Sequence, residues 1–180
     1  REPYETESDA VAVQVYMQNS GLNYSVFDFG NLKCKDLIEA IFIEMCAKNL
    51  SSLEELYKWC LLGALIECCR RIDCSTLLLG SSGTVHAVNF LSSLTRGRAS
   101  TAGSEAGFVD KRFRDVIILR PLCGLSAKEV SLYAHFSGIT ARSPEDLCTR
   151  TVLQSPVLTS TNRLLQNFLM GLQDNGFPST

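Results

Sequence analysis

Two short apolar runs constrain the fold of this chain more than any other feature of its sequence. Ser75–Leu79 ends at Gly80, and Val116–Leu119 is closed by Arg120 and Pro121. Such short, uninterrupted runs are typical of strands that are buried on both faces of a parallel sheet. Helical patterns lie before and after the runs, so we expect an α/β fold with a parallel sheet covered by helices.

Several segments carry helical patterns, and two of them begin with residues that suit a helix cap. The expected helices are Ala10–Asn19, Lys35–Lys48, Ser52–Arg71, Val85–Leu94, Ser126–Phe136 and Ser160–Gln173. Ser52 has Glu55 three residues later, which is the spacing of a capping box, and Ser126 has the same spacing to Glu129. In the first segment an alternation of valines leaves a strand as the alternative to a helix.

The remaining segments predict a third strand and two irregular stretches. Tyr24–Phe29 alternates and is rich in aromatic and β-branched residues, which is typical of a strand. Thr95–Arg114 contains several glycines and most of the basic charge, so we expect a loop. Gly138–Thr159 contains Pro144 and Pro156, and we expect it to be irregular.

The composition fits one globular domain and excludes several classes of protein. The 180 residues are 46% hydrophobic and 20% charged, which excludes a disordered chain and a coiled coil. The longest strongly apolar run, Cys60–Ile66, is too short to cross a bilayer, so no membrane partner is expected. The eight cysteines include no CxxC pair, which argues against a zinc ribbon and favours a reduced, cytoplasmic protein. Because the chain begins at Arg1 without a Met, we expect a fragment.

The Gly80–Thr84 turn lies where parallel sheets bind ligands, beyond the carboxyl end of a strand. Its hydroxyl groups and backbone N–H groups favour an anion. The candidate residues of this anion-binding turn are Gly80, Ser81, Ser82 and Thr84. The alternative is an ordinary strand-to-helix turn in which Ser82 or Thr84 caps the helix. Neither a P-loop nor a GxGxxG pattern is present, and residues 75–103 contain no carboxylate, so we expect no metal site there.

Basic side chains gather in the segment from Arg96 to Arg120. The candidate phosphate contacts are Arg96, Arg98, Lys111, Arg112, Arg114 and Arg120. A solvated loop is the alternative, and for Arg120 the alternative is an ion pair with Glu129 or Asp115. His86 and His135 have no recognisable partner for general base catalysis, so we expect structural or surface roles for both.

A series of segments, taken in order, resembles the middle of the cytoplasmic tRNA 2-thiolation protein 2 family. They are Leu77–Gly80, Leu94–Ser100, Asp115–Leu122, Lys128–Tyr133 and the closing segment from Asn162 to Thr180. The resemblance covers nearly the whole chain and implies a Rossmann-like, adenine nucleotide alpha hydrolase-like domain of the PP-loop ATP-pyrophosphatase superfamily. It implies one partial domain over residues 1–180 whose parallel sheet lacks its first strand, with 139–180 forming an irregular segment and a C-terminal helix. Pro121, Glu129 and Tyr133 fall on structural positions of the family motif.

The resemblance implies a cytoplasmic complex that 2-thiolates the wobble uridine of lysine, glutamine and glutamate tRNAs. A catalytic PP-loop paralogue would form a heterodimer with this chain and use ATP and Mg²⁺ to adenylate the uridine. A thiocarboxylated ubiquitin-related modifier would supply the sulfur. The basic segment of this chain would contact the tRNA.

The chain departs from the catalytic relatives at their Gly-His-Asn-x-Asp-Asp motif. The matching residues are Gly80–Val85, where both carboxylates are missing, and the SGGxDS loop and the family's Cys pairs are absent. We therefore expect a degenerate subunit with no catalytic residue, metal or cofactor of its own. Two alternatives stay open. One is an active ATP-dependent tRNA sulfurtransferase whose pyrophosphate loop is missing only from this fragment, and the other is a purely structural, partner-binding subunit.

Overall fold

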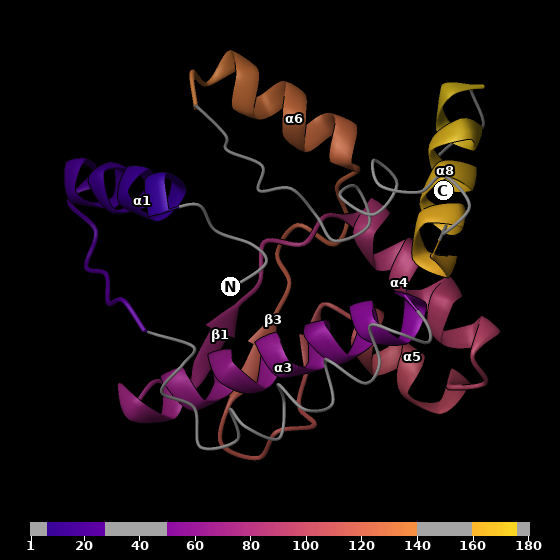
Figure 1. The fold of residues 1–180 in the computed structure, drawn as a ribbon, viewed down its shortest axis with the longest axis horizontal. Coiled ribbons are helices and arrows are strands. Elements are labelled where there is room, and N and C mark those ends of the chain that lie inside the picture. Colours follow the sequence, from indigo (N-terminus) through magenta and orange to yellow (C-terminus); the bar gives the residue numbers. More distant parts are fainter. Residues whose placement is uncertain (1–6, 28–49, 140–159, 176–180) are drawn as a thin grey trace.

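A computed structural model describes residues 7–27, 50–139 and 160–175 of the chain (Figure 1). In chain order, the helices and strands are α1 (Glu7–Ser20), α3 (Leu50–Arg71), β1 (Thr76–Leu78), α4 (Gly83–Thr95), α5 (Ala99–Ala106), β2 (Val109–Asp110), β3 (Ile117–Leu119), α6 (Ala127–Phe136) and α8 (Thr161–Asp174). Within these ranges, each helix is too short or too polar to cross a membrane.

The described strands form one small sheet in the order β1-β3-β2. β1 and β3 are parallel, with Thr76 opposite Ile117, which confirms the parallel pair expected from the two apolar runs. β2 is antiparallel to β3, with Asp110 opposite Ile118, and this strand was not expected from the sequence. The sheet is therefore mixed.

The hydrophobic core lies between α3 and one face of this sheet. Ile118 is completely buried, and it packs in one cluster with Ile66 and Cys69 of α3. Figure 1 shows α3 passing across the strands, and it packs against β1. Leu77 is opposite Ile118 in the sheet and packs against the same cluster. Because successive strand residues point to opposite faces, one face of the sheet supplies this core.

The other face of the sheet corrects the expectation of strands buried on both sides. Leu78 is 65% exposed, Val109 41% and Ile117 38%, and these side chains point away from α3. Among the described residues only the face with Ile118 is covered. The apolar runs therefore predicted the strands correctly but not their burial. Such a run places apolar side chains on both faces of its strand, so the sequence does not show which face is covered.

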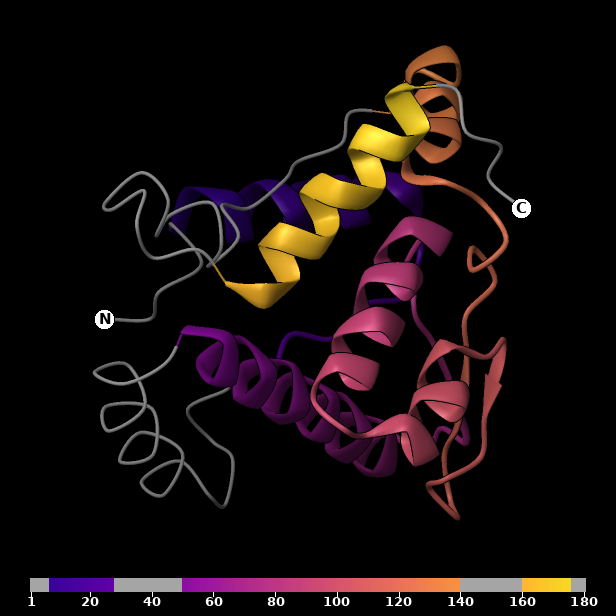
Figure 2. The ribbon, with the colours of Figure 1, turned by 90° about the vertical axis from the view of Figure 1, so that its right-hand side faces the viewer.

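The expected loop over Thr95–Arg114 is wrong, because this segment contains α5 and β2. α4 lies between α5 and α8 and packs against both (Figure 2). Ala102 of α5 is completely buried. Small side chains let α5 approach α4 closely, so packing between helices outweighs the weak helix propensity of a glycine- and serine-containing segment.

The helix ends agree with the sequence in some places and differ in others. α6 begins with the expected capping box, in which Glu129 N donates to Ser126 Oγ and Ser126 N donates to Glu129 Oε2. The capping box expected at Ser52 is wrong, because α3 already begins at Leu50. Ser51 Oγ instead accepts a hydrogen bond from Thr161 N at 3.0 Å, which ties α3 to the start of α8.

The N-terminal expectations have mixed outcomes. The helix expected over Ala10–Asn19 is confirmed by α1, which is followed by Gly21 with φ +68°. The strand alternative for this segment is therefore wrong. Residues 24–27 of the strand expected over Tyr24–Phe29 belong to no described strand, because no described strand pairs with them. The helix expected over Lys35–Lys48 lies outside the described residues.

Candidate functional site

The turn from Gly80 to Thr84 connects β1 to α4, as the sequence predicts. Ser82 occupies the N-cap position of α4, but its side chain makes no capping hydrogen bond. Gly83 N donates to Leu125 O at 2.6 Å, so this N–H group is already used within the chain. A Cβ atom on Gly83 would lie 2.7 Å from Cys123 O, so the turn is packed directly against the backbone before α6.

Thr84 links three helices. Its Oγ1 accepts a hydrogen bond from Ala127 N of α6 at 3.0 Å and another from Gln173 Nε2 of α8 at 3.5 Å. The residue is 8% exposed. Thr84 is therefore not the helix cap that the sequence left open, and its hydroxyl holds α6 and α8 against α4.

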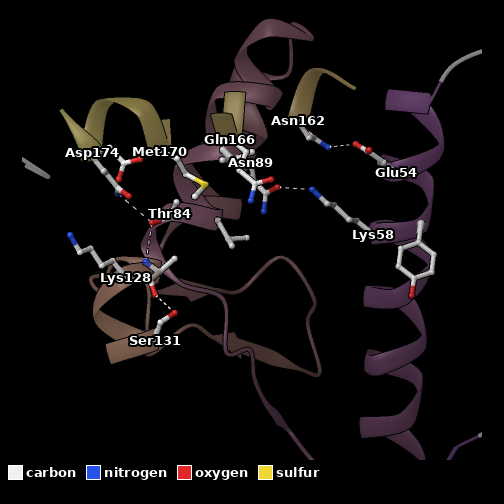
Figure 3. Close-up of a pocket in the computed structure, with 15 residues that line it drawn as sticks. Glu54, Lys58, Thr84, Asn89, Lys128, Ser131, Asn162, Gln166, Met170 and Asp174 are labelled. Atoms are coloured by element: carbon white, nitrogen blue, oxygen red, sulfur yellow. Dashed lines mark hydrogen bonds between the residues drawn. The ribbon is translucent and has the colours of Figure 1, made fainter. Parts of the chain in front are cut away.

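A cavity of about 540 Å³ lies over this turn, between α3, α4, α6 and α8 (Figure 3). Four carboxamide side chains line it: Asn89, Asn162, Gln166 and Gln173. Lys58 Nζ donates to Asn89 Oδ1 at 2.8 Å, and Asn162 Nδ2 donates to Glu54 Oε2 at 2.8 Å. These bonds connect α3 to α4 and to α8 across the cavity.

Two carboxylates reach this cavity from elsewhere in the chain, Glu54 of α3 and Asp174 of α8. The sequence around Gly80 gave no sign of them, because they come from segments far away in the chain. Within the described ranges, no three His, Cys, Asp or Glu side chains come together in a group that could hold a metal ion.

Most arginine side chains of the basic segment form ion pairs with carboxylates of the same chain. Arg96 and Arg98 both pair with Glu55 of α3. Arg112 Nη1 lies 3.0 Å from Glu105 Oε1, and its Nη2 lies 2.7 Å from Asp110 Oδ2. Of the six candidate phosphate contacts, Lys111 and Arg114 are exposed and have no ion-pair partner in the part of the chain that the structure describes.

Arg120 is a buried structural residue, 4% exposed. Its Nη2 lies 3.2 Å from Asp110 Oδ2, and its Nη1 donates to Gly107 O at 3.0 Å. Neither ion pair that the sequence left open for Arg120 forms, since Asp115 pairs with Arg70 and Glu129 belongs to the α6 cap. The reason is the unexpected strand β2, which places Asp110 on the same face of the sheet as Arg120.

Asp110 holds this network together as a charged carboxylate. It is 1% exposed, and burial alone would raise its pKa. Hydrogen bonds from Arg112 and then Arg120 outweigh burial, and the pKa of Asp110 lies below its ordinary value. The carboxylate is therefore ionised at neutral pH and matches the two guanidinium groups around it.

A second cavity, of about 310 Å³, lies between α3 and α4 and contains His86. His86 is 7% exposed, and no described residue makes a hydrogen bond of good geometry to either ring nitrogen. Burial lowers the pKa of His86, and the nearby Arg120 lowers it further, so the ring is neutral at pH 7. The sequence predicted a structural or surface role, and the ring is buried.

The remaining motif residues lie at the edge of the site. Glu129 Oε2 accepts from Ser126 N at 2.7 Å, which lowers the pKa of Glu129 and fixes the start of α6. Tyr133 is 72% exposed on the same helix, and Pro121 is exposed directly after Arg120. Their family role stays a prediction.

Two of three comparisons with known proteins found proteins similar to this chain. It is 32% identical over 133 residues to cytoplasmic tRNA 2-thiolation protein 2 of Danio rerio, covering 74% of this chain and 26% of that protein. It is 28% identical over 143 residues to the human protein of the same name, covering 79% and 27%. No family model matches. The matches confirm the resemblance seen in the sequence, and the chain spans about a quarter of the length of these relatives.

The fold is confirmed by a solved structure, the U34-tRNA thiolase NcsA from Methanococcus maripaludis with its [4Fe-4S] cluster. The TM-score is 0.64 at 15% identity, over 98% of this chain and 53% of that chain. Clusters of this kind are held by Cys thiolates. The described cysteines are free thiols that do not form such a group, and burial raises the pKa of the Cys69 thiol.

Proposed function

We propose, from the homology of this chain to a segment of the cytoplasmic tRNA 2-thiolation protein 2 family, that it takes part in tRNA thiolation in the cytoplasm. The reaction is 2-thiolation of the wobble uridine in lysine, glutamine and glutamate tRNAs, which yields 5-methoxycarbonylmethyl-2-thiouridine. The observation that carries this proposal is the sequence match to relatives that bear this name. The fold match to a tRNA thiolase agrees with it.

The proposed role is that of a non-catalytic subunit in a heterodimer with a catalytic PP-loop paralogue. ATP and Mg²⁺ would act in the paralogue, and a thiocarboxylated ubiquitin-related modifier would supply the sulfur. Two observations support this division of labour. The Gly80–Val85 segment contains no carboxylate, and the Gly83 N–H group that could hold a phosphate already donates to Leu125 O.

The proposed tRNA contacts follow from which cations are available. Arg112 and Arg120 are engaged with Asp110, and Arg96 and Arg98 with Glu55, whereas Lys111 and Arg114 are exposed. Exposed cations gain most from phosphate contacts because they give up no internal partner. Lys111 and Arg114 would therefore make the sequence-independent contacts.

The binding test uses the full-length heterodimer and an unmodified lysine tRNA at several salt concentrations. We expect the double change Lys111→Ala and Arg114→Ala to weaken binding and to reduce the salt slope by about one unit for each lost contact. The matched control, Lys111→Arg with Arg114→Lys, keeps both charges and should keep the affinity. If the alanine variant and the wild type have the same affinity and the same salt dependence, Lys111 and Arg114 do not contact the tRNA.

The functional test measures 2-thiouridine in lysine, glutamine and glutamate tRNAs by mass spectrometry. Cells lacking their own homologue should regain the modification when they receive the full-length gene. Unmodified tRNA in cells that contain folded protein and the paralogue would contradict the proposal.

One observation favours a second candidate, an ATP-dependent sulfurtransferase. Glu54 and Asp174 line the cavity over Thr84, where the sequence offers no local carboxylate. ATP–pyrophosphate exchange by the full-length chain without its paralogue, abolished by Asp174→Asn, would favour this candidate. Exchange that requires the paralogue would favour the non-catalytic role.

A further inference from the structure

The two cavities adjoin each other in one groove between α3 and α4. Both are lined by Lys58, Val85, Asn89 and Asn162, so they share a wall. We call the part with the four carboxamides the amide lobe, and the part with His86 and the arginines the arginine lobe. Their volumes, about 540 and 310 Å³, are within the range of ligand sites.

The arginine lobe has an excess of positive charge. Its cationic side chains are Lys58, Arg96, Arg98, Arg112 and Arg120. The carboxylates that face them are Glu55 and Glu105 in the lining and Asp110 behind it. Lys58 donates to Asn89 Oδ1 and is left out of the balance. The four arginines against three carboxylates leave one positive charge, which matches the single negative charge of a phosphodiester in an RNA strand.

Several polar atoms in this lobe are buried without a hydrogen-bond partner among the described residues. They are Arg96 Nη2, Arg98 Nε, both ring nitrogens of His86 and one acceptor, Glu55 Oε1, which lies in the ion pair with Arg98. A buried N–H group that makes no hydrogen bond to water or to the protein destabilises the fold. An oxygen atom of a ligand would accept its hydrogen bond and remove this cost. Because His86 is itself more than nine-tenths buried, the lobe contains a preformed polar site rather than an ordinary charged surface.

The amide lobe contains hydrogen-bonding groups that suit a nucleobase. Carboxamide groups can donate and accept at once, which is how Asn and Gln hydrogen-bond to the edges of nucleobases. The buried Oδ1 atom of Asn162 has no hydrogen-bond partner among the described residues, so one acceptor is open. Val85, Val88 and Met170 supply apolar surface for the faces of a ring.

We propose that this groove binds one unpaired nucleotide of an RNA strand, with the base in the amide lobe and its phosphate on the N–H groups of Arg96 and Arg98 that their ion pairs with Glu55 leave without a hydrogen bond. The choice of RNA over a free nucleotide rests on the proposed function in tRNA thiolation. It is also supported by Arg112, which lines the arginine lobe and is followed along the chain by the exposed cation Arg114. A strand that leaves the lobe there would meet further positive charge.

Trp59 provides the measurement. It is the only tryptophan of the chain and lines the arginine lobe, where the Arg112 guanidinium lies 5.9 Å from its ring centre. We would titrate the intact 180-residue chain with pentauridylate, UMP, uridine and inorganic phosphate, following tryptophan fluorescence and, for labelled RNA, anisotropy. Pentauridylate should bind at least tenfold more tightly than UMP, and UMP more tightly than uridine or phosphate.

Three results would overturn the proposal. Phosphate or uridine binding as tightly as UMP would show that one lobe acts alone. UMP binding as tightly as pentauridylate would show a mononucleotide site rather than an RNA site. If neither method detects binding of any probe, the groove does not bind nucleotides.

Matched variants locate the binding to the groove. Arg96→Ala should weaken RNA binding at least tenfold, whereas Arg71→Ala, an exposed arginine outside the groove, should not. Gln166→Ala should weaken binding of RNA and UMP but leave phosphate binding unchanged, and its neighbour Asn167→Ala, outside the groove, should change neither. Equal affinities within either pair, with circular dichroism showing folded protein, would contradict the assignment.

This test and that of the proposed function can fail separately. If Gln166→Ala leaves RNA binding unchanged and the protein still restores thiolation, the groove site is rejected and the proposed function stands. RNA binding in the groove by a protein that never restores thiolation would reject the proposed function and leave the groove site in place.

Discussion

At the scale of single residues, Asp110 has the largest structural role in the basic segment. It lies on the buried face of β2, and its carboxylate contacts both Arg112 and Arg120. The sequence showed the three residues but not their contacts, because a two-residue strand leaves almost no pattern. The sequence therefore predicts a phosphate contact for Arg120, whereas burial and three hydrogen bonds make this residue part of the fold.

Removing this carboxylate should strongly destabilise the protein. We expect Asp110→Ala to lower the free energy of unfolding by about 3–5 kcal/mol, because Arg120 would remain buried and unpaired. Urea unfolding followed by circular dichroism measures this difference. The control Asp115→Ala breaks an exposed ion pair with Arg70 and should cost far less. Similar losses for the two variants would contradict the structural role of Asp110.

The same residue predicts a pH dependence of stability. Because the pKa of Asp110 is lower in the folded than in the unfolded chain, the unfolded chain takes up the proton first as the pH falls. The stabilisation is complete above the ordinary carboxyl pKa of about 4 and is lost as the pH falls through the lower folded-state pKa. The difference in unfolding free energy between wild type and Asp110→Asn should therefore be constant from about pH 7 to 5 and shrink below about pH 4. A constant difference down to about pH 3 would show that the pKa is not lowered.

At the scale of elements, the turn before α4 depends on the absence of a side chain at Gly83. A Cβ atom there would meet Cys123 O at 2.7 Å and Leu125 O at 3.0 Å, both of them backbone atoms. We expect Gly83→Ala to destabilise the protein by about 1–3 kcal/mol, measured by thermal unfolding.

A glycine on another helix serves as the control for this prediction. Gly63 lies within α3 and has no described atom within 4 Å of its added Cβ. Gly63→Ala should stabilise the protein by about 0.5–1 kcal/mol, because alanine loses less conformational freedom in a helix. A neutral result for Gly83→Ala would mean that the segment before α6 can move away.

The elements that the sequence predicted share a strong local signal. β1 and β3 follow from apolar runs, α6 from its capping box and helical periodicity, and α8 from its helical periodicity. α5 and β2 lack such a signal, since Ala102 becomes a core residue only through its contact with α4. The strand expected from Tyr24 failed for the opposite reason, because a good local pattern found no partner among the described strands.

At the scale of the whole molecule, the candidate groove is built from distant segments. Glu54 and Asn162 are 108 positions apart in sequence and meet at 2.8 Å. Sequence analysis found the Gly80–Thr84 turn and the basic segment, which lie at the edges of this groove. It could not find the carboxamides, because each of them looks like an ordinary surface residue of a helix until α8 packs on α4.

The packing of α6 and α8 on α4 depends on one hydroxyl group. We expect Thr84→Val to cost about 1–3 kcal/mol, because Ala127 N would be left without its acceptor. Relative to the wild type, Thr84→Val should accelerate amide hydrogen exchange more in α6 and α8 than in α3. In the control, Thr95→Val, only a bond to Ser92 O within α4 is lost, so exchange in α6 should not change. Uniform acceleration in all helices would contradict this view.

The sheet with one covered face also has an evolutionary consequence. Ile118 is surrounded by the core, whereas its neighbour Ile117 and the adjacent Leu78 point outward and are partly exposed among the described residues. The described core therefore restrains every second strand position more strongly than the positions between them. If those outward positions nevertheless resist polar replacement in living cells, the restraint comes from contacts beyond the described core.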